Sequence, residues 1–362
     1  MGRAGMSEGA VQGPRAVAAQ RAPFEVEFLN EQRLPAVLRP AGAGDRGPEA
    51  VAALLERDDV RLLLRRYGAV LFRGYDLPTE SAFTDVVARH YGDEASAYVG
   101  GISPRTAVRE SQIYESTKIP AALRIHQHNE MAYMKRAPRD LLFFCDIPSP
   151  EGGETPLTDC RKLMQEVPEE IRDTFKRRGL RNREHFYGRF WNFWTFGMHT
   201  SFVRLHRSWP SVFNTHDRDE VRRICKSLNV RLQWIWDGSI RLTCRRPPTA
   251  HHPDTGEEVW FNQASTLNVT AYVYGWLKYL GYHIAYPFTR YRPFDVSYSD
   301  KGRIPHSYLR AIQQATDRVT TAFPWQKGDL LWIDNFLVAH GRMPYKGPRR
   351  ILVAIGPMVD SV

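Results

Sequence analysis

The sequence predicts a mainly β protein with helices, built on a double-stranded β-helix (jelly-roll) core with helical insertions. Short apolar runs bounded by glycine, proline or polar residues occur toward both ends of the chain, as expected for buried strands. The middle instead alternates helical periodicity with aromatic-rich segments. Strands from both ends that share one core are typical of a jelly roll, and 362 residues with 43% hydrophobic content can bury such a core.

Residues 1–22 are rich in Ala, Gly, Arg and Gln and hold no continuous apolar segment of the kind that a secretory signal needs. We expect a disordered tail there and a single domain over residues 23–362. The first half of this domain is predicted to contain a helix at 49–66, a strand at 68–74, a helix at 80–90, strands at about 124–133 and at 141–146, and a turn at Gly152-Gly153.

The segment from about 165 to 310 is less regular, and we interpret it as an insertion that forms a lid and substrate wall. Helical patterns occur at 168–178, 217–228 and 306–320, and an aromatic-rich run spans Phe186 to Trp194. Aromatic side chains more often fill a core than bind a ligand, so an accessory core is the alternative. Apolar runs at 329–333 and 351–355 then predict two further buried strands.

A His-x-Glu triplet, His128 to Glu130, is the first candidate for chemistry. Residues two apart on a strand point the same way, so His128 and Glu130 can face one metal ion. His126 shares that face and is an alternative ligand by geometry alone. The third ligand must come from elsewhere, and His340 is best placed. Two imidazoles and a carboxylate form the triad that holds Fe(II) and leaves positions open for a co-substrate and O2, although these ligands alone also allow a zinc hydrolase.

Two arginines follow the last histidine and bear on the co-substrate. 2-Oxoglutarate chelates iron through its keto-acid end, and its second carboxylate needs a cation at the far end of the pocket. Arg350 opens the apolar run at 351–355 and is expected to point into the barrel. Arg349 would then face the other side, as part of a solvated basic turn.

Other polar residues near these segments have simpler expected roles. Asp334 and Asn335 precede His340 and are expected to orient it through hydrogen bonds. His251 and His252 lie before an apparent turn, where exposed histidines are usual.

Four blocks in order along the chain resemble the TauD/TfdA family of Fe(II)/2-oxoglutarate dioxygenases. Within that family the chain is similar to the branch of syringomycin-type aspartate hydroxylases, with clavaminate synthase as a more distant relative. The resemblance runs from about residue 65 to the C-terminus. The four blocks are His128–Tyr133, Gly152–Asp159, Gly256–Gln263 and the segment around His340.

This resemblance implies that His128, Glu130 and His340 bind Fe(II), that Arg350 holds the distal carboxylate of 2-oxoglutarate, and that the Thr155 hydroxyl supports it. Many members carry Asp where this chain has Glu130, and Glu is the ligand in the clavaminate-like branch. The implied reaction, with O2 as second co-substrate, is hydroxylation of an unactivated C–H bond. The implied substrate is a free or carrier-tethered amino acid, or a derivative, in natural-product biosynthesis. Desaturation or ring closure stays open, as does a non-catalytic cupin-like module that binds metal or a carrier protein.

Charge, hydropathy and cysteine usage indicate which kinds of partner and which cellular compartment to expect. The formal net charge is +10 at pH 7, but Lys and Arg are dispersed and no nucleic-acid recognition motif accompanies them. We expect anionic small molecules or an acidic carrier protein to be attracted, with unspecific surface charge as the alternative. No apolar run approaches the roughly 20 residues that span a bilayer. The four cysteines show no Cys-x-x-Cys spacing, which suits a reducing cytoplasm, and Cys145 is expected in the core.

Overall fold

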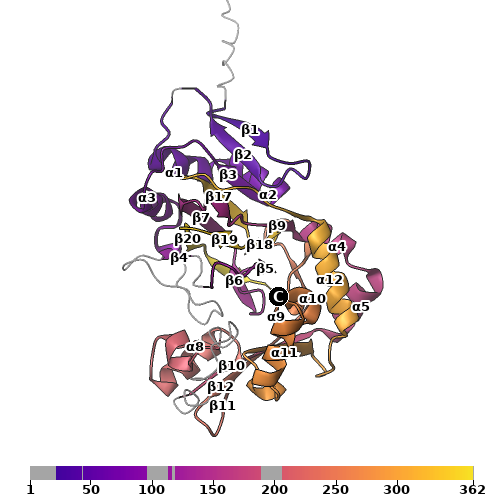
Figure 1. The fold of residues 1–362 in the computed structure, drawn as a ribbon. Coiled ribbons are helices and arrows are strands. Elements are labelled where there is room, and N and C mark those ends of the chain that lie inside the picture. The colour runs from indigo at the N-terminus through magenta and orange to yellow at the C-terminus, as the bar shows by residue number, and fades with distance from the viewer. Residues whose placement is uncertain (1–21, 43, 96–112, 116–118, 189–205, 362) are drawn as a thin grey trace, which may run out of the picture.

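The computed structural model describes residues 22–42, 44–95, 113–115, 119–188 and 206–361 (Figure 1). The predicted tail, apart from residue 22, and most of the aromatic-rich run lie outside these residues. The chain is a mixture of helices and many short strands, as predicted at the level of fold class.

A seven-stranded sheet forms the centre of the molecule. Its order is β1 (Phe24–Phe28), β2 (Ala36–Pro40), β3 (Ala69–Phe72), β17 (Leu330–Asp334), β7 (Asp140–Ile147), β20 (Arg350–Ile355) and β4 (Ile113–Glu115). Neighbours are antiparallel except for β2 and β3. Strands from the two ends of the chain therefore pair with one another, as a shared core requires.

Helices α1 (Pro48–Glu56), α2 (Asp58–Tyr67) and α3 (Glu80–Tyr91) supply the apolar side chains that pack against one face of this sheet (Figure 1). Val51, Leu55 and Phe83 join Phe144 and Leu352 in that layer. Because the other face is also buried, the middle residues of β7, β17 and β20 are apolar, and the charged residues of these strands lie toward their ends.

A second, four-stranded sheet packs on the inner face. Its order is β16 (Thr320–Thr321), β9 (Leu157–Asp159), β18 (Val338–Arg342) and β5 (Ile125–His128). Leu157 and Val338 share a core with Phe143 and Leu331 of the large sheet. The two sheets meet closely, since the Phe143 ring lies 5.0 Å from the ring of His340.

The predicted insertion contains a third sheet, ordered β11 (Arg231–Trp234), β12 (Ile240–Arg246), β10 (Leu180–Phe186) and β15 (Phe294–Tyr298). Figure 1 shows it at the end of the molecule opposite β1 and β2.

The remaining helices are α4 (Cys160–Glu166), α5 (Glu169–Arg178), α7 (Trp209–Phe213), α8 (Arg218–Ser227), α9 (Ala264–Leu267), α10 (Ala271–Tyr274), α11 (Trp276–Ala285) and α12 (His306–Arg318), with 3-10 turns at Gly92–Glu94 and Thr289–Tyr291. The short strand pairs are β13 (Thr249–His251) with β14 (Glu258–Trp260), β8 (Glu151–Gly152) with β19 (Tyr345–Lys346), and β6 (Arg136–Pro138) with β21 (Met358–Asp360).

Most predicted elements are present, and one is divided. The helix predicted at 49–66 is two helices, because Arg57 is extended (φ −72°, ψ 136°) and breaks the helical path. The Asp59 carboxylate accepts a 2.9 Å hydrogen bond from the Val60 N–H. This bond lies in the first turn of α2, where backbone N–H groups have no partner within the helix. Its carboxylate also receives two bonds from Arg57, which hold its pKa below the usual range.

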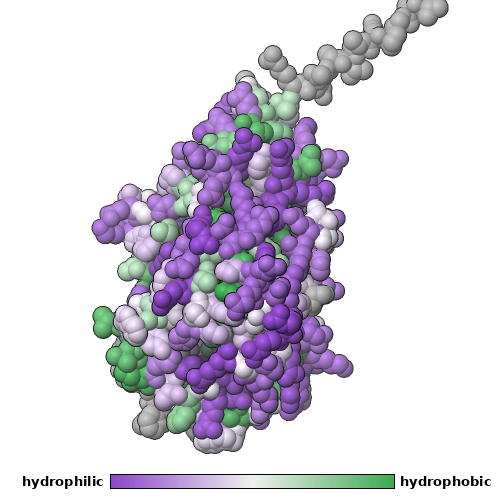
Figure 2. All heavy atoms as spheres, turned by 90° about the vertical axis from the view of Figure 1, so that its right-hand side faces the viewer, coloured by the Kyte–Doolittle hydropathy of each residue, from purple (hydrophilic) through white to green (hydrophobic). Residues whose placement is uncertain are grey.

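One face of the molecule is mainly polar. Figure 2 shows a largely hydrophilic face, although Trp276, Leu277, Leu280 and Ile284 of α11 are exposed. Within the described residues, every helix is too short or too polar to cross a bilayer.

Candidate metal centre

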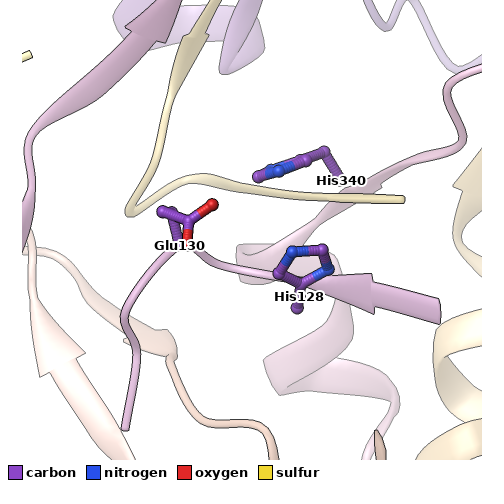
Figure 3. A group of neighbouring side chains, drawn as sticks. All are labelled: His128, Glu130 and His340. Carbon is purple, nitrogen blue, oxygen red and sulfur yellow. The ribbon is translucent and has the colours of Figure 1, made fainter. Parts of the chain in front are cut away.

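Two neighbouring strands bring the predicted metal ligands together. His128 is the last residue of β5, and His340 of β18 is its direct partner across the antiparallel pair. Their ring centroids lie 4.7 Å apart. One ligand atom each from His128, Glu130 and His340 lies within 4.8 Å of the others, and Figure 3 shows the three side chains converging.

Glu130 reaches this group by a different route from the one predicted. Strand β5 ends at His128, so the alternation of side chains on a strand does not place Glu130. A turn follows instead, in which Met131 has a φ of 55° and the Ala132 N–H bonds to the Asn129 carbonyl over 3.2 Å. The turn curls the chain so that Glu130, only 2% exposed, points back toward the histidines (Figure 3).

Two side-chain amides hold this turn. Asn335 bonds to both backbone groups of Glu130 and also donates to the Pro138 carbonyl over 2.8 Å. Gln263, from the insertion, donates to the Asn129 carbonyl over 2.7 Å. The sequence resemblance includes Gln263 but gives it no role. Its hydrogen bond shows that the insertion supports the turn at 129–132, which we call the metal loop. Asn335 was expected to orient His340, but its side chain bonds to the backbone of Glu130.

The segment that leads to His340 is fixed by a buried pair. His252 Nε2 lies 2.8 Å from Asp334 Oδ2, while Asp334 Oδ1 accepts from the N–H groups of Phe336 and Leu337. Since His252 Nδ1 accepts two backbone N–H bonds, Nε2 carries the proton and donates to Asp334. The prediction that this histidine is exposed is therefore wrong: it is 1% exposed, whereas His251 is exposed.

The donor chemistry of the group suits Fe(II). His128 Nδ1 lies 2.9 Å from the His126 carbonyl, which can only accept, so Nδ1 carries the hydrogen and the Nε2 lone pair is free for a metal. His126 itself stands outside the group and packs edge-on against Tyr274. Burial, with help from the nearby Arg124, lowers the pKa of His126 to about 4. Two imidazoles and one carboxylate, largely shielded from water, fit the iron triad.

The side chains of Arg349 and Arg350 point in the opposite directions to those predicted. Arg350 lies on the outer face of the large sheet, where Nη1 donates to Asp146 over 2.8 Å and Nη2 donates to Glu80 of α3 over 2.6 Å. The prediction that Arg350 points into the barrel is wrong. The run that follows it is apolar on both faces, so its pattern could not show which face is the interior.

Arg349 is the arginine on the inner side. Its Nε donates to the Gly153 carbonyl over 2.9 Å, and its guanidinium lies 5.5 Å from the Tyr345 ring centre. Among the described residues no carboxylate forms an ion pair with it. Burial, helped by the nearby positive charge of Arg342, lowers the pKa of Arg349 to about 10. Such a partly desolvated cation would gain from an anionic ligand.

Thr155 lies close along the chain to Gly153 and is 3% exposed. Its Oγ1 accepts a 3.0 Å hydrogen bond from the Trp325 indole. The hydroxyl hydrogen remains available as a donor. The positive φ of Gly152 and Gly153 confirms the predicted turn, and a side chain at Gly152 would collide with the Pro344 carbonyl.

Comparison with known proteins settles the class. Residues 37–355 match the family model described as taurine catabolism dioxygenase TauD, TfdA family. The chain belongs to the TauD/TfdA family. This TauD/TfdA enzyme is an Fe(II)- and 2-oxoglutarate-dependent oxygenase, as its sequence motifs predict.

Two curated relatives of this TauD/TfdA enzyme have biosynthetic names. It is 30% identical over 304 residues to the dapdiamide synthesis protein DdaC of Enterobacter agglomerans, covering 83% of this chain and 85% of the relative. It is 31% identical over 340 residues to a clavaminate synthase-like protein of Arabidopsis thaliana, covering 89% and 93%.

The fold is shared with solved oxygenases. PvcB from Pseudomonas aeruginosa aligns over 95% of each chain with a TM-score of 0.52 and 14% identity. A second structure of PvcB, an Fe, α-ketoglutarate-dependent oxygenase from an isonitrile synthetic pathway, covers 98% of this chain and 95% of its own, with a TM-score of 0.51 and 15% identity.

Proposed function

We propose that His128, Glu130 and His340 bind Fe(II), and that the enzyme hydroxylates an unactivated C–H bond of an amino acid or a derivative, free or carrier-tethered, in natural-product biosynthesis. The observation that carries this proposal is the convergence of these three side chains within 4.8 Å. With both co-substrates bound, iron supplies an oxidant strong enough to break such a bond. The protein's own task is to hold the ligands and choose the hydrogen.

For 2-oxoglutarate, we assign the distal carboxylate to Arg349 in place of Arg350, with Thr155 as the second donor. Arg350 is already engaged by Glu80 and Asp146, whereas Arg349 forms no ion pair within the described residues. A guanidinium can bind a carboxylate through two parallel bonds. The Gly153 carbonyl fixes the orientation of Arg349, so less side-chain entropy is lost on binding.

A role in biosynthesis is favoured by the name of the dapdiamide synthesis relative, and an anionic substrate by the net charge of +10. The pairing of strands from both chain ends supports one jelly-roll domain over residues 23–362. All four cysteines are free and buried, in keeping with a reducing cytoplasm.

The proposal is tested by turnover. The purified enzyme with Fe(II), 2-oxoglutarate and O2 is screened against free amino acids and carrier-bound aminoacyl thioesters, and succinate and product mass are measured. A product heavier by one oxygen atom, formed together with succinate and absent for Glu130→Ala, supports hydroxylation. A product lighter by two hydrogen atoms would assign a desaturase or cyclase instead. Iron binding without 2-oxoglutarate consumption across the screen would favour a non-catalytic binding module.

A further inference from the structure

One face of the insertion sheet carries rows of arginine side chains. Across β10 and β12, Arg181 pairs with Arg245, and Arg183 pairs with Thr243. Because these positions alternate along their strands, Arg181, Arg183, Arg241 and Arg245 all lie on one face, and cross-strand side chains there are close neighbours. Like charges placed this way repel each other.

This face borders a cavity of about 770 Å³ whose lining is strongly basic. Its described lining contains no Asp or Glu. Only two of its basic residues have a carboxylate partner within the described residues: Arg183 with Asp295 at 2.9 Å, and Arg222 with Asp219. The nine basic lining residues are Lys135, Arg181, Arg183, Arg222, Lys226, Arg231, Arg241, Arg245 and Lys301, and we call this cavity the arginine basin.

The other hydrogen bonds in the basin leave the positive charge uncompensated. Arg181 Nε donates to the Ser297 hydroxyl over 3.2 Å, and Arg241 Nη2 donates to the Arg290 carbonyl over 3.0 Å, so both partners are neutral. Partial burial and neighbouring arginines lower the pKa of both groups. Arg73, which is also buried, is by contrast paired with the carboxylate of Asp329. An anionic ligand would compensate the positive charge of the basin.

We propose that the arginine basin binds a compact ligand carrying two or more phosphate groups. Planar guanidinium groups grip phosphate oxygens in pairs, and several of them converging in one cavity match the charge of linked phosphates better than that of a single carboxylate. Arg181, Arg183 and Arg241 are only partly exposed, so they suit a compact ligand that enters the cavity. A long nucleic acid is better served by protruding side chains.

The basin is separate from the metal centre, since none of the three metal-ligand candidates lines it. It does touch the segment that follows the metal loop, because Lys135 is part of its lining. Binding there is therefore expected to be independent of iron.

The test is calorimetric titration of the metal-free full-length protein with tripolyphosphate at constant ionic strength. Arg181→Gln/Arg241→Gln is compared with wild type and with Arg177→Gln/Arg223→Gln, which removes two exposed arginines outside the basin. We expect binding to weaken by at least about tenfold in the basin variant and to be unchanged in the control, because two charged hydrogen-bond donors are lost. Arg181→Lys/Arg241→Lys, which keeps the charge, should recover part of the affinity.

Other results would overturn the proposal. Equal weakening in both double glutamine variants would show unspecific charge attraction. Loss of tripolyphosphate binding in a folded His340→Ala variant would place the ligand at the metal centre. Tight binding of duplex DNA without measurable binding of tripolyphosphate would assign this face to nucleic acid. Thermal unfolding of each variant checks that it is folded before titration.

Discussion

A single side chain, that of Asn335, binds both backbone polar groups of Glu130. The Glu130 N–H donates to Asn335 Oδ1 over 2.7 Å, and Asn335 Nδ2 donates to the Glu130 carbonyl over 3.0 Å. Asn335 is fully buried, and it lies five residues before His340. One amide therefore ties the turn that carries the carboxylate to the segment that carries the distant histidine.

Replacing Asn335 by Ala should weaken Fe(II) binding by about 10- to 100-fold, as is typical when a partner that orients a metal-ligand segment is lost. The expected cause is a mobile Glu130 turn with two unpaired backbone groups. Anaerobic Fe(II) titration measures the effect. Asn262→Ala is the control, because Asn262 bonds to the Pro248 carbonyl and the Ala264 N–H, outside the metal loop. Unchanged iron affinity in a folded Asn335→Ala protein would contradict this role.

A buried ion pair joins the strand regions near the two ends of the chain. Arg73 forms two bonds to Asp329, of 3.0 and 2.6 Å, and the two side chains are 4% and 1% exposed. Arg73→Met should lower the free energy of unfolding by about 3–5 kcal/mol, since it leaves the buried carboxylate of Asp329 without its ion-pair partner. Arg73→Met/Asp329→Leu should cost less than the single change. Urea unfolding measures the stability of both variants. A double variant that is much less stable than Arg73→Met would argue against this explanation.

Glu184 of β10 gives a pH-dependent prediction. It is 5% exposed, Oε2 has no hydrogen-bond partner among the described residues, and burial raises its pKa from 4.5 to about 8. The folded state therefore keeps a proton that the unfolded state releases above 4.5. Stability from this group is fully present below pH 4.5 and is lost as pH rises toward about 8, at about 1.4 kcal/mol per pH unit.

Glu184→Gln should remove that loss, so its stability relative to wild type should increase between about pH 6 and about pH 8. Urea unfolding of both proteins at the two pH values gives the difference and cancels the contributions of other groups. A constant difference would mean that Glu184 ionises normally in the folded protein.

Local sequence patterns predicted many of the regular elements, but not the four-stranded sheet of the insertion. Strands β3, β7, β17 and β20 and helices α3, α5, α8 and α12 each carry an apolar pattern or a boundary residue that is visible in the sequence. The break at Arg57 was not visible, because helical periodicity continues across it. A backbone break of one residue leaves the spacing of apolar residues almost unchanged.

The geometry of the site could not be predicted from local sequence patterns alone. The three metal-ligand candidates could be chosen from spacing and resemblance, but the turn after His128 depends on Asn335 and Gln263, far along the chain. His252 can be buried because Asp334, 82 residues away, accepts its hydrogen bond. The direction of the Arg350 side chain was predicted wrongly because a strand covered on both faces carries no polar side to mark its orientation.

The most direct test of the proposed centre is anaerobic titration with Fe(II) and then 2-oxoglutarate, following the visible metal-to-ligand charge-transfer band in wild type, Arg349→Gln and Arg350→Gln. We predict a band in all three, with at least about tenfold more 2-oxoglutarate needed only for Arg349→Gln, because a charged two-bond contact is lost. A wild-type protein that binds iron but gives no band, or a shift confined to Arg350→Gln, would contradict the account.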